Sequence, residues 1–264
     1  MRTNHEIDYR IIGEEMQYVE IELDPNETAI AESGSFMMMD DGIQMATILG
    51  DGSQQNSGGL LGKLLGAGKR LLVGESLFMT AFSNVAMGKK KVSFASPYPG
   101  KIIPLDLLQL GGKVICQKDA FLCAAKGVSI GIDFQRKLGT GIFGGEGFIM
   151  ERLEGDGMAF VHAGGHVFER ELQPGEMVKI DTGCLVALTS QVTYDIQFVG
   201  GIRNTIFGGE GLFFATLRGP GKVWIQTLPV SRLASRILSY GRGHRKEEGS
   251  VLGGLGNVLD GDGW

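Results

Sequence analysis

The sequence predicts an all-β protein of three tandem repeats arranged about a pseudo-threefold axis, with one short C-terminal helix. Three observations lead to this fold class. Glycine supplies 43 of 264 residues and proline only 7, a composition typical of many tight turns between short strands. The string IFGGEG occurs twice, 64 residues apart, at Ile142–Gly147 and Ile206–Gly211. Short segments with alternating or β-branched residues lie around these strings.

A weaker copy of the repeat lies upstream. Leu23–Glu27 (LDPNE) resembles Leu172–Glu176 (LQPGE), and a Gly-Glu pair follows each of them, at Glu75 and at Glu210. The interval from the first Glu to the second is 48 residues in the upstream copy and 34 in the downstream copy. The upstream copy therefore carries a 14-residue insertion, which we place within Gly52–Arg70 because glycine and polar residues are typical of surface loops.

The expected elements are short strands followed by one helix. Apolar residues at i, i+3, i+4, i+7 and i+8 from Val230 follow Pro229 and predict an amphipathic helix. Arg218–Gly221 (RGPG) is typical of a β-hairpin turn, and Glu154–Gly157 is the matching turn of the preceding copy. The predicted strands are Met16–Leu23, Phe36–Asp40, Val114–Gln117, Met177–Asp181, Thr193–Phe198, Leu212–Leu217 and Lys222–Thr227.

These elements predict one β domain over residues 1–240. Its repeats cover about 14–106, 107–171 and 172–228, the helix covers 229–240, and residues 241–264 form a mobile glycine-rich tail. Each repeat is too small to bury both faces of its sheet. Three copies packed about an axis would close the sheet and hide its edges.

Composition narrows the functional classes. The net charge of −5 disfavours a general nucleic-acid binder, which would carry a basic excess. Cys116, Cys123 and Cys184 show no CxxC spacing, so buried thiols in a reducing compartment are expected rather than disulfides or a zinc site. The first residues lack the apolar region of a signal peptide, and the chain has no apolar run long enough to span a membrane. We therefore expect a cytoplasmic protein.

Several passages together carry a family resemblance over about Glu14–Leu238. They are Gly74–Phe82 (GESLFMTAF), Ser96–Leu107 (SPYPGKIIPLDL), Leu138–Phe148 (LGTGIFGGEGF), Phe160–Glu176 (FVHAGGHVFERELQPGE), Tyr194–Ile202 (YDIQFVGGI) and Ile206–Pro229 (IFGGEGLFFATLRGPGKVWIQTLP). The chain resembles bacterial members of the family named for the mitochondrial biogenesis factor "altered inheritance of mitochondria".

The resemblance implies three β-repeats similar to the subunit of the tryptophan RNA-binding attenuation protein, a double-stranded β-helix type. It implies no catalytic or ligand residues. Eukaryotic relatives are mitochondrial inner-membrane factors linked to membrane organisation, whereas the present chain lacks the features of a transit peptide. The role of these relatives is therefore only a loose analogy for the function of this chain.

Two glycine-rich motifs do not predict a nucleotide site. Gly139–Gly144 spells GxGxxG, but a strand rather than a helix is predicted after it, so turn formation explains it better. Gly66–Lys69 and Leu61–Lys63 lack the Ser or Thr and the glycine spacing of a phosphate-binding loop.

A histidine pair is the strongest candidate for a metal site. His162 and His166 flank Gly164 and Gly165, and a tight glycine turn could bring both imidazoles together across a hairpin. A tetrahedral metal site needs three or four ligands, and Glu169 and Glu171 are merely near in sequence. A polar turn is therefore the favoured interpretation.

Repeated glutamates form a second candidate. Glu75, Glu146 and Glu210 each follow glycine at the same point of the repeat, so they could accept backbone hydrogen bonds from a neighbouring unit. A threefold acidic cluster that holds a cation is the functional alternative.

Basic and apolar surface stretches complete the candidates. Lys89–Lys91 and the cluster Arg242, His244, Arg245 and Lys246 are interpreted as a solvated loop and tail. The insertion at 52–70 and the leucine-bearing tail could instead contact a protein partner or a membrane surface.

The sequence favours a non-enzymatic scaffold or binding module that associates with itself as a homo-oligomer. The repeated residues are glycine, phenylalanine, leucine and glutamate of turns and core, so we assign no catalytic, cofactor-binding or metal-binding residue and no cofactor. The question of enzymatic activity stays open. The alternative is a metal-dependent enzyme or ion-binding protein that uses His162 and His166.

Overall fold

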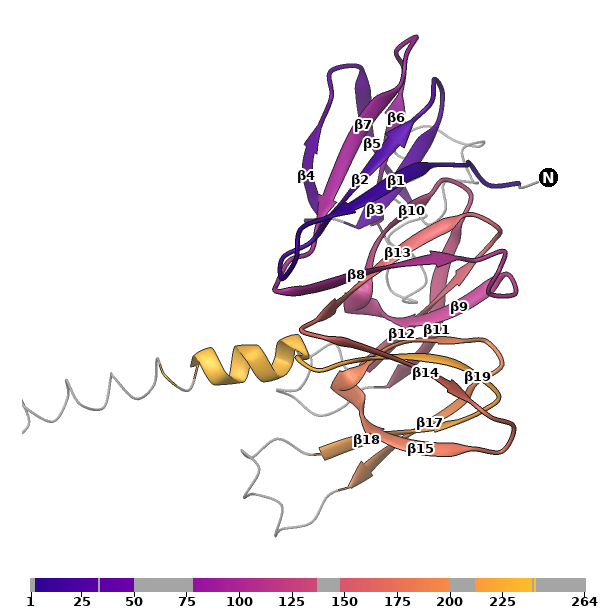
Figure 1. Ribbon diagram of the computed structural model, residues 1–264, viewed down its shortest axis with the longest axis vertical. Coiled ribbons are helices and arrows are strands. Elements are labelled where there is room, and N and C mark those ends of the chain that lie inside the picture. Colours follow the sequence, from indigo (N-terminus) through magenta and orange to yellow (C-terminus); the bar gives the residue numbers. More distant parts are fainter. Residues whose placement is uncertain are drawn as a thin grey trace, which may run out of the picture.

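The computed structural model describes residues 3–32, 34–49, 78–136, 148–199, 212–238 and 240. Nearly all regular structure in these residues is antiparallel β-sheet, and one α-helix, at 230–238, follows the last strand. The predicted all-β class with a short C-terminal helix is therefore confirmed. Figure 1 shows the strands gathered in layers along the long axis of the molecule, with the helix projecting from one side.

Two sheets form the N-terminal half. The first contains, in spatial order, β1 (Asp8–Ile12), β2 (Tyr18–Leu23), β7 (Lys90–Ala95) and β4 (Phe36–Met39). The second contains β5 (Ile43–Leu49), β6 (Phe78–Asn84), β3 (Thr28–Glu32), β10 (Phe121–Ala125), β13 (Met158–Gly164) and β8 (Gly100–Asp106).

Two further sheets form the C-terminal half. The third contains β11 (Ser129–Arg136), β12 (Phe148–Glu154), β9 (Lys113–Gln117), β16 (Leu185–Thr189), β19 (Gly221–Gln226) and β14 (Val167–Leu172). The fourth contains β15 (Met177–Asp181), β18 (Leu212–Arg218) and β17 (Thr193–Val199).

Among the described residues, three hydrophobic cores separate the four sheets. Phe82 and Phe94 meet edge to face at 5.1 Å in the first core, between the first and second sheets. Phe121 belongs to the second core, and Leu185 and Phe213 to the third. Burying a large apolar side chain contributes about 1.5–3 kcal/mol, so each inner sheet is stabilised on both faces.

The strand positions follow the spacing seen in the sequence. β9, β10, β11 and β12 begin at residues 113, 121, 129 and 148, and β15, β16, β17 and β18 begin at 177, 185, 193 and 212. Each pair differs by 64 residues. The short helical turns at Lys118–Ala120 and Thr182–Cys184 keep the same spacing.

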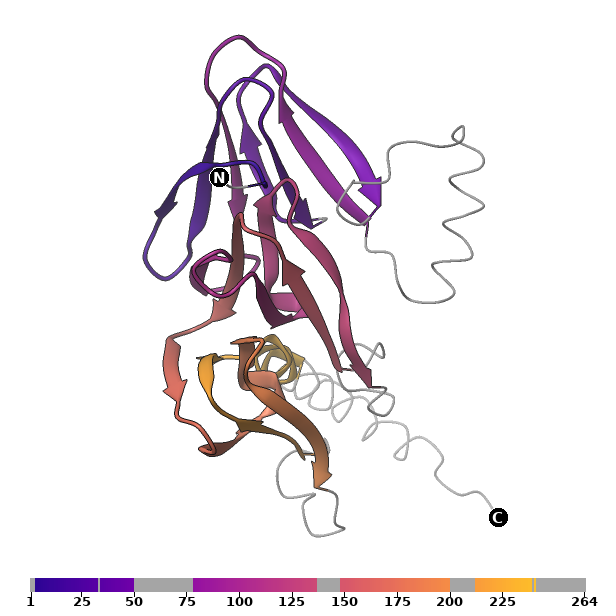
Figure 2. The ribbon, with the colours of Figure 1, turned by 90° about the vertical axis from the view of Figure 1, so that its right-hand side faces the viewer.

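The arrangement of the described sheets differs from the closed pseudo-threefold packing that we expected. Each six-stranded sheet joins strands from consecutive parts of the chain, so the four sheets form a row from β4 at one end to β15 at the other (Figures 1 and 2). β4 pairs only with β7, and β15 only with β18, among the described strands. Strand pairing thus joins each part of the chain to the next part, and no described strand of the last part pairs with a strand of the first.

The predicted hairpin at Arg218–Gly221 is wrong. β18 lies in the fourth sheet and β19 in the third, so this turn crosses from one sheet to the next across a core. The matching turn at Glu154–Gly157 likewise joins β12 of the third sheet to β13 of the second. Glycine is needed at the crossing, because a Cβ on Gly219 would lie 2.4 Å from the Gln173 carbonyl oxygen. Glycine turns of this kind predict a sharp reversal but not the partner of the strand that follows.

Candidate functional site

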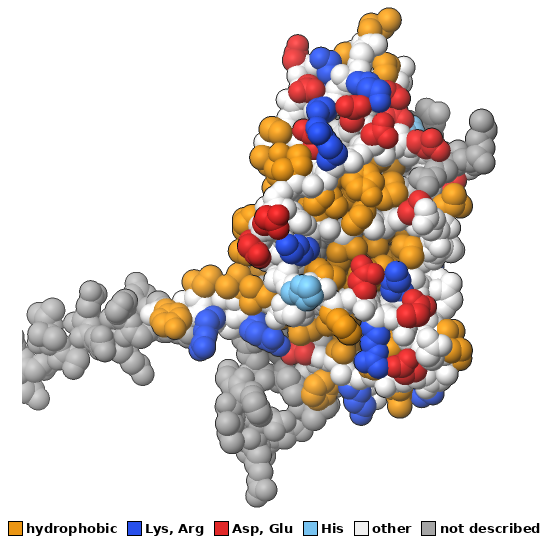
Figure 3. Space-filling model, in the orientation of Figure 1, with side chains coloured by type: hydrophobic (Ala, Val, Ile, Leu, Met, Phe, Trp, Pro, Cys, Tyr) orange, Lys and Arg blue, Asp and Glu red, His pale blue; other side chains and the backbone are white. Residues whose placement is uncertain are grey.

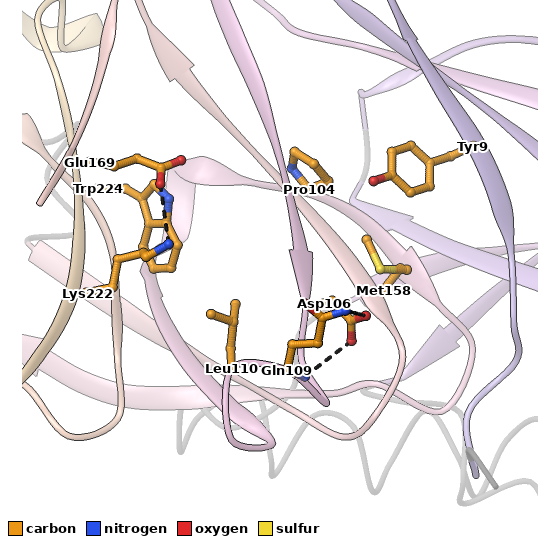
Figure 4. A pocket seen from close by; sticks show the side chains of 9 residues that line it. All are labelled: Tyr9, Pro104, Asp106, Gln109, Leu110, Met158, Glu169, Lys222 and Trp224. Carbon is orange, nitrogen blue, oxygen red and sulfur yellow. Dashed lines mark hydrogen bonds and ion pairs between the residues drawn. The ribbon is translucent and has the colours of Figure 1, made fainter. Parts of the chain in front are cut away.

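A side cavity of about 460 Å³ opens where the second and third sheets meet, and Figure 4 shows its lining. Its described walls are Tyr9, Pro104, Asp106, Gln109, Leu110, Met158, Glu169, Lys222 and Trp224. Figure 3 shows apolar side chains gathered in the middle of this face, with charged side chains above and below them. The hollow is therefore lined by apolar side chains together with charged and amide groups.

An ion pair, a cation–π contact and an amide hydrogen bond lie at the rim of the cavity. The Lys222 ammonium lies 5.6 Å from the centre of the Trp224 ring and 3.5 Å from a Glu169 carboxylate oxygen. The Gln109 amide donates to the Asp106 carboxylate at 3.0 Å. The described lining residues therefore offer apolar and ionic contacts.

The two candidate histidines do not converge. His162 is buried in β13, where its ring meets Tyr98 at 4.9 Å, and burial lowers the pKa of His162 to about 4. His166 is exposed. The expected hairpin is absent from this segment, because β13 belongs to the second sheet and β14, which follows Gly164 and Gly165, belongs to the third.

The metal-site hypothesis therefore gains no support. Within the described parts of the chain, no group of three or more histidine, cysteine or acidic side chains is placed to hold a metal ion. Glu169 faces Lys222 at the cavity rim rather than either histidine. Glu75, Glu146 and Glu210 lie outside the described residues, as do the GxGxxG motif at 139–144, the insertion at 52–70 and the tail at 241–264.

The basic stretch Lys89–Lys91 is neutralised by neighbouring strands. The Lys89 ammonium lies 2.8 Å from Glu22, and the Lys91 ammonium lies 3.0 Å from Glu20, which also binds Arg10 at 2.7 Å. These bridges span β1, β2 and β7 on the outer face of the first sheet. The lysines are thus part of a mixed-charge sheet surface rather than a solvated loop available to an anionic partner.

One buried acid, Glu151 of β12, was not predicted from the sequence. Glu151 is only 2% exposed, and burial, with a further contribution from the charge of Glu32, raises the pKa of Glu151 to about 8. Lys118 opposes this shift. The residue 64 positions later is Ala215, which lies in the core of β18. An acid that aligns with a core residue at this spacing is the sequence signal that could have indicated a buried carboxyl.

Among the described strands, β4 is apolar and exposed throughout. Its four residues, Phe36, Met37, Met38 and Met39, are 41%, 47%, 45% and 38% exposed. Residues of this kind would suit a strand covered on both faces, and an exposed apolar edge is normally protected. At the other end of the row, Met177 of β15 is 51% exposed.

The C-terminal helix adds a second exposed apolar surface. Val230, Ile237 and Leu238 are 39%, 62% and 61% exposed, whereas Arg232 reaches Asp181 at 3.3 Å. The helix therefore contacts the sheets near its beginning and leaves these three apolar residues exposed. It is too short to span a membrane, and no other helix among the described residues has the required length and hydropathy.

Comparison with known proteins places this all-β chain in a family. The model of the Mitochondrial biogenesis AIM24 family matches residues 9–228. An uncharacterized protein of Streptococcus pyogenes serotype M6 is 31% identical over 234 residues, which cover 87% of this chain and 89% of the relative. The chain belongs to the Mitochondrial biogenesis AIM24 family, which confirms the resemblance found in the sequence.

The fold is also similar to that of a solved structure. The X-ray crystal structure of a Streptococcus pyogenes protein superposes with a TM-score of 0.69 at 26% identity. The match covers 89% of this chain and 99% of the neighbour.

Proposed function

We propose that this protein is a non-enzymatic cytoplasmic scaffold that binds further copies of itself. The observation that carries the proposal is β4, an edge strand made of one phenylalanine and three methionines, all exposed. Strand edges expose unpaired N–H and C=O groups that accept another strand, and folded proteins usually cover them or place charges on them. Here the edge is apolar and open, as a self-association surface would be.

The polar groups support a binding role more than a catalytic one. His162 is sealed in the core with a depressed pKa, and Cys116 and Cys123 are buried thiols whose pKa values are raised by burial. A nucleophile needs access and an adjacent base. The reduced, buried cysteines also suit the reducing cytoplasm.

We also propose that the recurring strand order reflects three copies of one six-stranded unit. The order favours β2, β8 and β14 as the first strand of each unit, because each lies beside the last strand of its own unit, β7, β13 or β19. The second and third units then begin a few residues earlier than 107 and 172. The exposed helix face is available for a further protein partner or a membrane surface.

Light scattering coupled to size-exclusion chromatography tests self-association. The expected result is a mass above the 28.3 kDa of one chain, rising with concentration in the micromolar range. A single-chain mass at every concentration would overturn the self-association part of the proposal. Metal content measured on protein purified without a histidine tag tests the enzyme alternative, since a stoichiometric transition metal that is lost in His162→Ala would support it.

A further inference from the structure

The chain joins its own units through one kind of strand contact. β3 pairs with β10 in the second sheet, and β9 pairs with β16 in the third. Both contacts are antiparallel and cover three residue pairs each. In β3–β10 the first pair is Cys123 with Ala31, and in β9–β16 it is Ala187 with Cys116. Each contact turns two three-stranded halves into a six-stranded sheet.

β4 occupies the same structural position as β10 and β16. Each of these strands pairs on one side with the last strand of its unit, β7, β13 or β19. Each pairing is interrupted by an irregularity after the first residue, between Phe36 and Met38, between Phe121 and Cys123, and between Leu185 and Ala187. Because such irregularities are specific local features, their recurrence identifies the three strands as equivalent.

β15 occupies the same position as β3 and β9. It pairs with β18 as β3 pairs with β6 and as β9 pairs with β12. On its other side β3 has β10 and β9 has β16, but β15 has no further strand among those described. The row of units therefore ends in two complementary edges.

Other edge strands do not share this property. β8 and β14 are the outermost strands on one side of the six-stranded sheets, and β5 and β11 are the outermost on the other. The position of β5 and β11 is an edge in every described sheet. β2, which holds the position of β8 and β14 in the first unit, pairs on its outer side with β1, the strand just before it. The fold therefore uses neither position to join units. Among the described strands, only β4 and β15 are open at positions that elsewhere join one unit to the next.

We propose that β15 of one copy pairs antiparallel with β4 of a second copy and so continues the row. In both internal contacts the first residue after the irregularity faces the fourth residue of the partner strand. Applied to the open edges, this register places Met38 opposite Ile180 and Met39 opposite Lys179. The inference rests on the self-association proposed above and specifies its surface and register.

Burial favours this pairing. β10 and β16 are buried at every residue, because the pairing strand and two cores cover them. All four residues of β4 are exposed, although it has the same structural position. The contact must be between copies, since β4 and β15 lie at opposite ends of the long axis (Figures 1 and 2). A head-to-tail contact of this kind gives a ring if its rotation closes and an open row if it does not.

Charge placed on the β4 edge tests the surface. Met39→Lys should lower the association constant at least tenfold, because the ammonium would be buried opposite Lys179. Met87→Lys is the matched control, since Met87 is 98% exposed in the β6–β7 turn and belongs to neither edge strand. Light scattering should give smaller particles for Met39→Lys only, with the circular dichroism and melting temperature of dilute protein unchanged in both variants.

A disulfide between copies tests the register. One chain carries Met39→Cys and the other Lys179→Cys, both with Cys184→Ser to remove the one native thiol that is not fully buried. Directly opposed antiparallel residues have Cα atoms about 4.5–5.5 Å apart, within disulfide range. Mild oxidation of the mixture should give a cross-linked dimer, and a mixture of Met87→Cys with Lys179→Cys should not.

The outcomes separate this inference from the function proposed above. A wild-type protein that is monomeric at all concentrations would overturn both. An oligomer that survives Met39→Lys and yields no 39–179 disulfide would overturn the edge pairing and leave self-association standing. Equal loss of association in Met39→Lys and Met87→Lys would also overturn the edge pairing.

Discussion

Strand β10, in the middle of the row of sheets, and strand β4, at one end, have similar pairing on one side but differ in burial. β10, in the second sheet, is covered by cores on both faces and by strands on both sides, and all its residues are buried. β4 holds the same position in the first sheet but is covered on one side only, and all its residues are exposed. The comparison shows that the place of a strand in the row of sheets decides what that strand contacts.

The largest effect should come from truncating the equivalent phenylalanines. Phe121 of β10 is 2% exposed and Phe36 of β4 is 41% exposed. Phe121→Ala should lower the free energy of unfolding by about 3–5 kcal/mol, because it leaves a cavity in a packed core. Phe36→Ala should cost about 1 kcal/mol, since it loses mainly its stacking on Phe82 at 5.4 Å.

Urea unfolding of dilute protein measures both free energies. Dilution matters because association would add stability to the β4 end by mass action. Equal losses for the two variants would show that the end sheet is as well packed as the middle.

The buried acid of the middle sheets should give the next largest effect. The raised pKa of Glu151, about 8, means that the folded state binds a proton more tightly than the unfolded state, whose pKa is near 4.5. Stability should therefore fall as pH rises from 4.5 to 8 and then level off. Glu151→Gln should raise the free energy of unfolding by about 1–3 kcal/mol at pH 8 and leave it nearly unchanged at pH 4.5.

Melting curves across this pH range test the Glu151 prediction. Glu32, Lys118 and Asp119 also act on this carboxyl, so Glu32→Gln is the matched comparison. It should reduce the pH dependence without removing it. A Glu151→Gln profile parallel to that of the wild type would contradict the shift.

His162 should produce a smaller loss with the opposite dependence on pH. Burial lowers the pKa of His162 to about 4, whereas the unfolded chain titrates near 6.5. The unfolded state then binds more protons between these values, so stability should fall as pH decreases from 6.5 to 4. His162→Leu should reduce this loss by about 1–2 kcal/mol.

The exposed histidine provides the control for this loss. His166→Leu, in the turn after β13, should follow the wild-type profile. Chemical unfolding at pH 4.5 and 7 checks both variants. Identical profiles for the two leucine variants would contradict a special environment for His162.

Local pattern predicted much of the fold but not the pairing of strands. The predicted segments Met177–Asp181 and Thr193–Phe198 agree with β15 and β17 to within one residue. The fully buried strand β10 was not predicted, because residues covered on both faces do not alternate. The turn at Arg218–Gly221 indicated a reversal, but whether the next strand pairs in the same sheet depends on contacts with β16, far away in sequence.

The candidate site was less predictable for the same reason. His162 and His166 are close in sequence and lie on either side of a crossing between sheets. The apolar sequence of β4 would be the same if another strand covered it, so the sequence does not reveal that the strand is exposed. Its openness depends on its being first in the row, and only the strand order shows that.

The smallest expected effect compares one turn at the two ends of the row. Glu27 and Glu176 each accept a backbone N–H three residues earlier, from Asp24 and from Gln173, both at 2.7 Å. Burial, followed by the charge of Asp24, raises the pKa of Glu27. The backbone hydrogen bond and Arg170 lower the pKa of Glu176. The same turn thus holds a carboxyl with opposite pKa shifts, because burial dominates at Glu27 whereas the backbone hydrogen bond and then Arg170 dominate at Glu176.

The sign of the pH dependence should therefore differ between the two turns. Glu176 contributes stability above its unfolded pKa of 4.5 and loses it as pH falls through the lowered value, so Glu176→Gln should melt below the wild type at pH 7 and match it at pH 3. Glu27→Gln should melt no lower than the wild type at pH 7, because the folded state disfavours the ionised form. Carboxyl chemical shifts followed by NMR measure the two pKa values directly. Arg170→Ala should raise that of Glu176 and leave that of Glu27 unchanged, and a shift of both would show that the turns are not governed by their local partners.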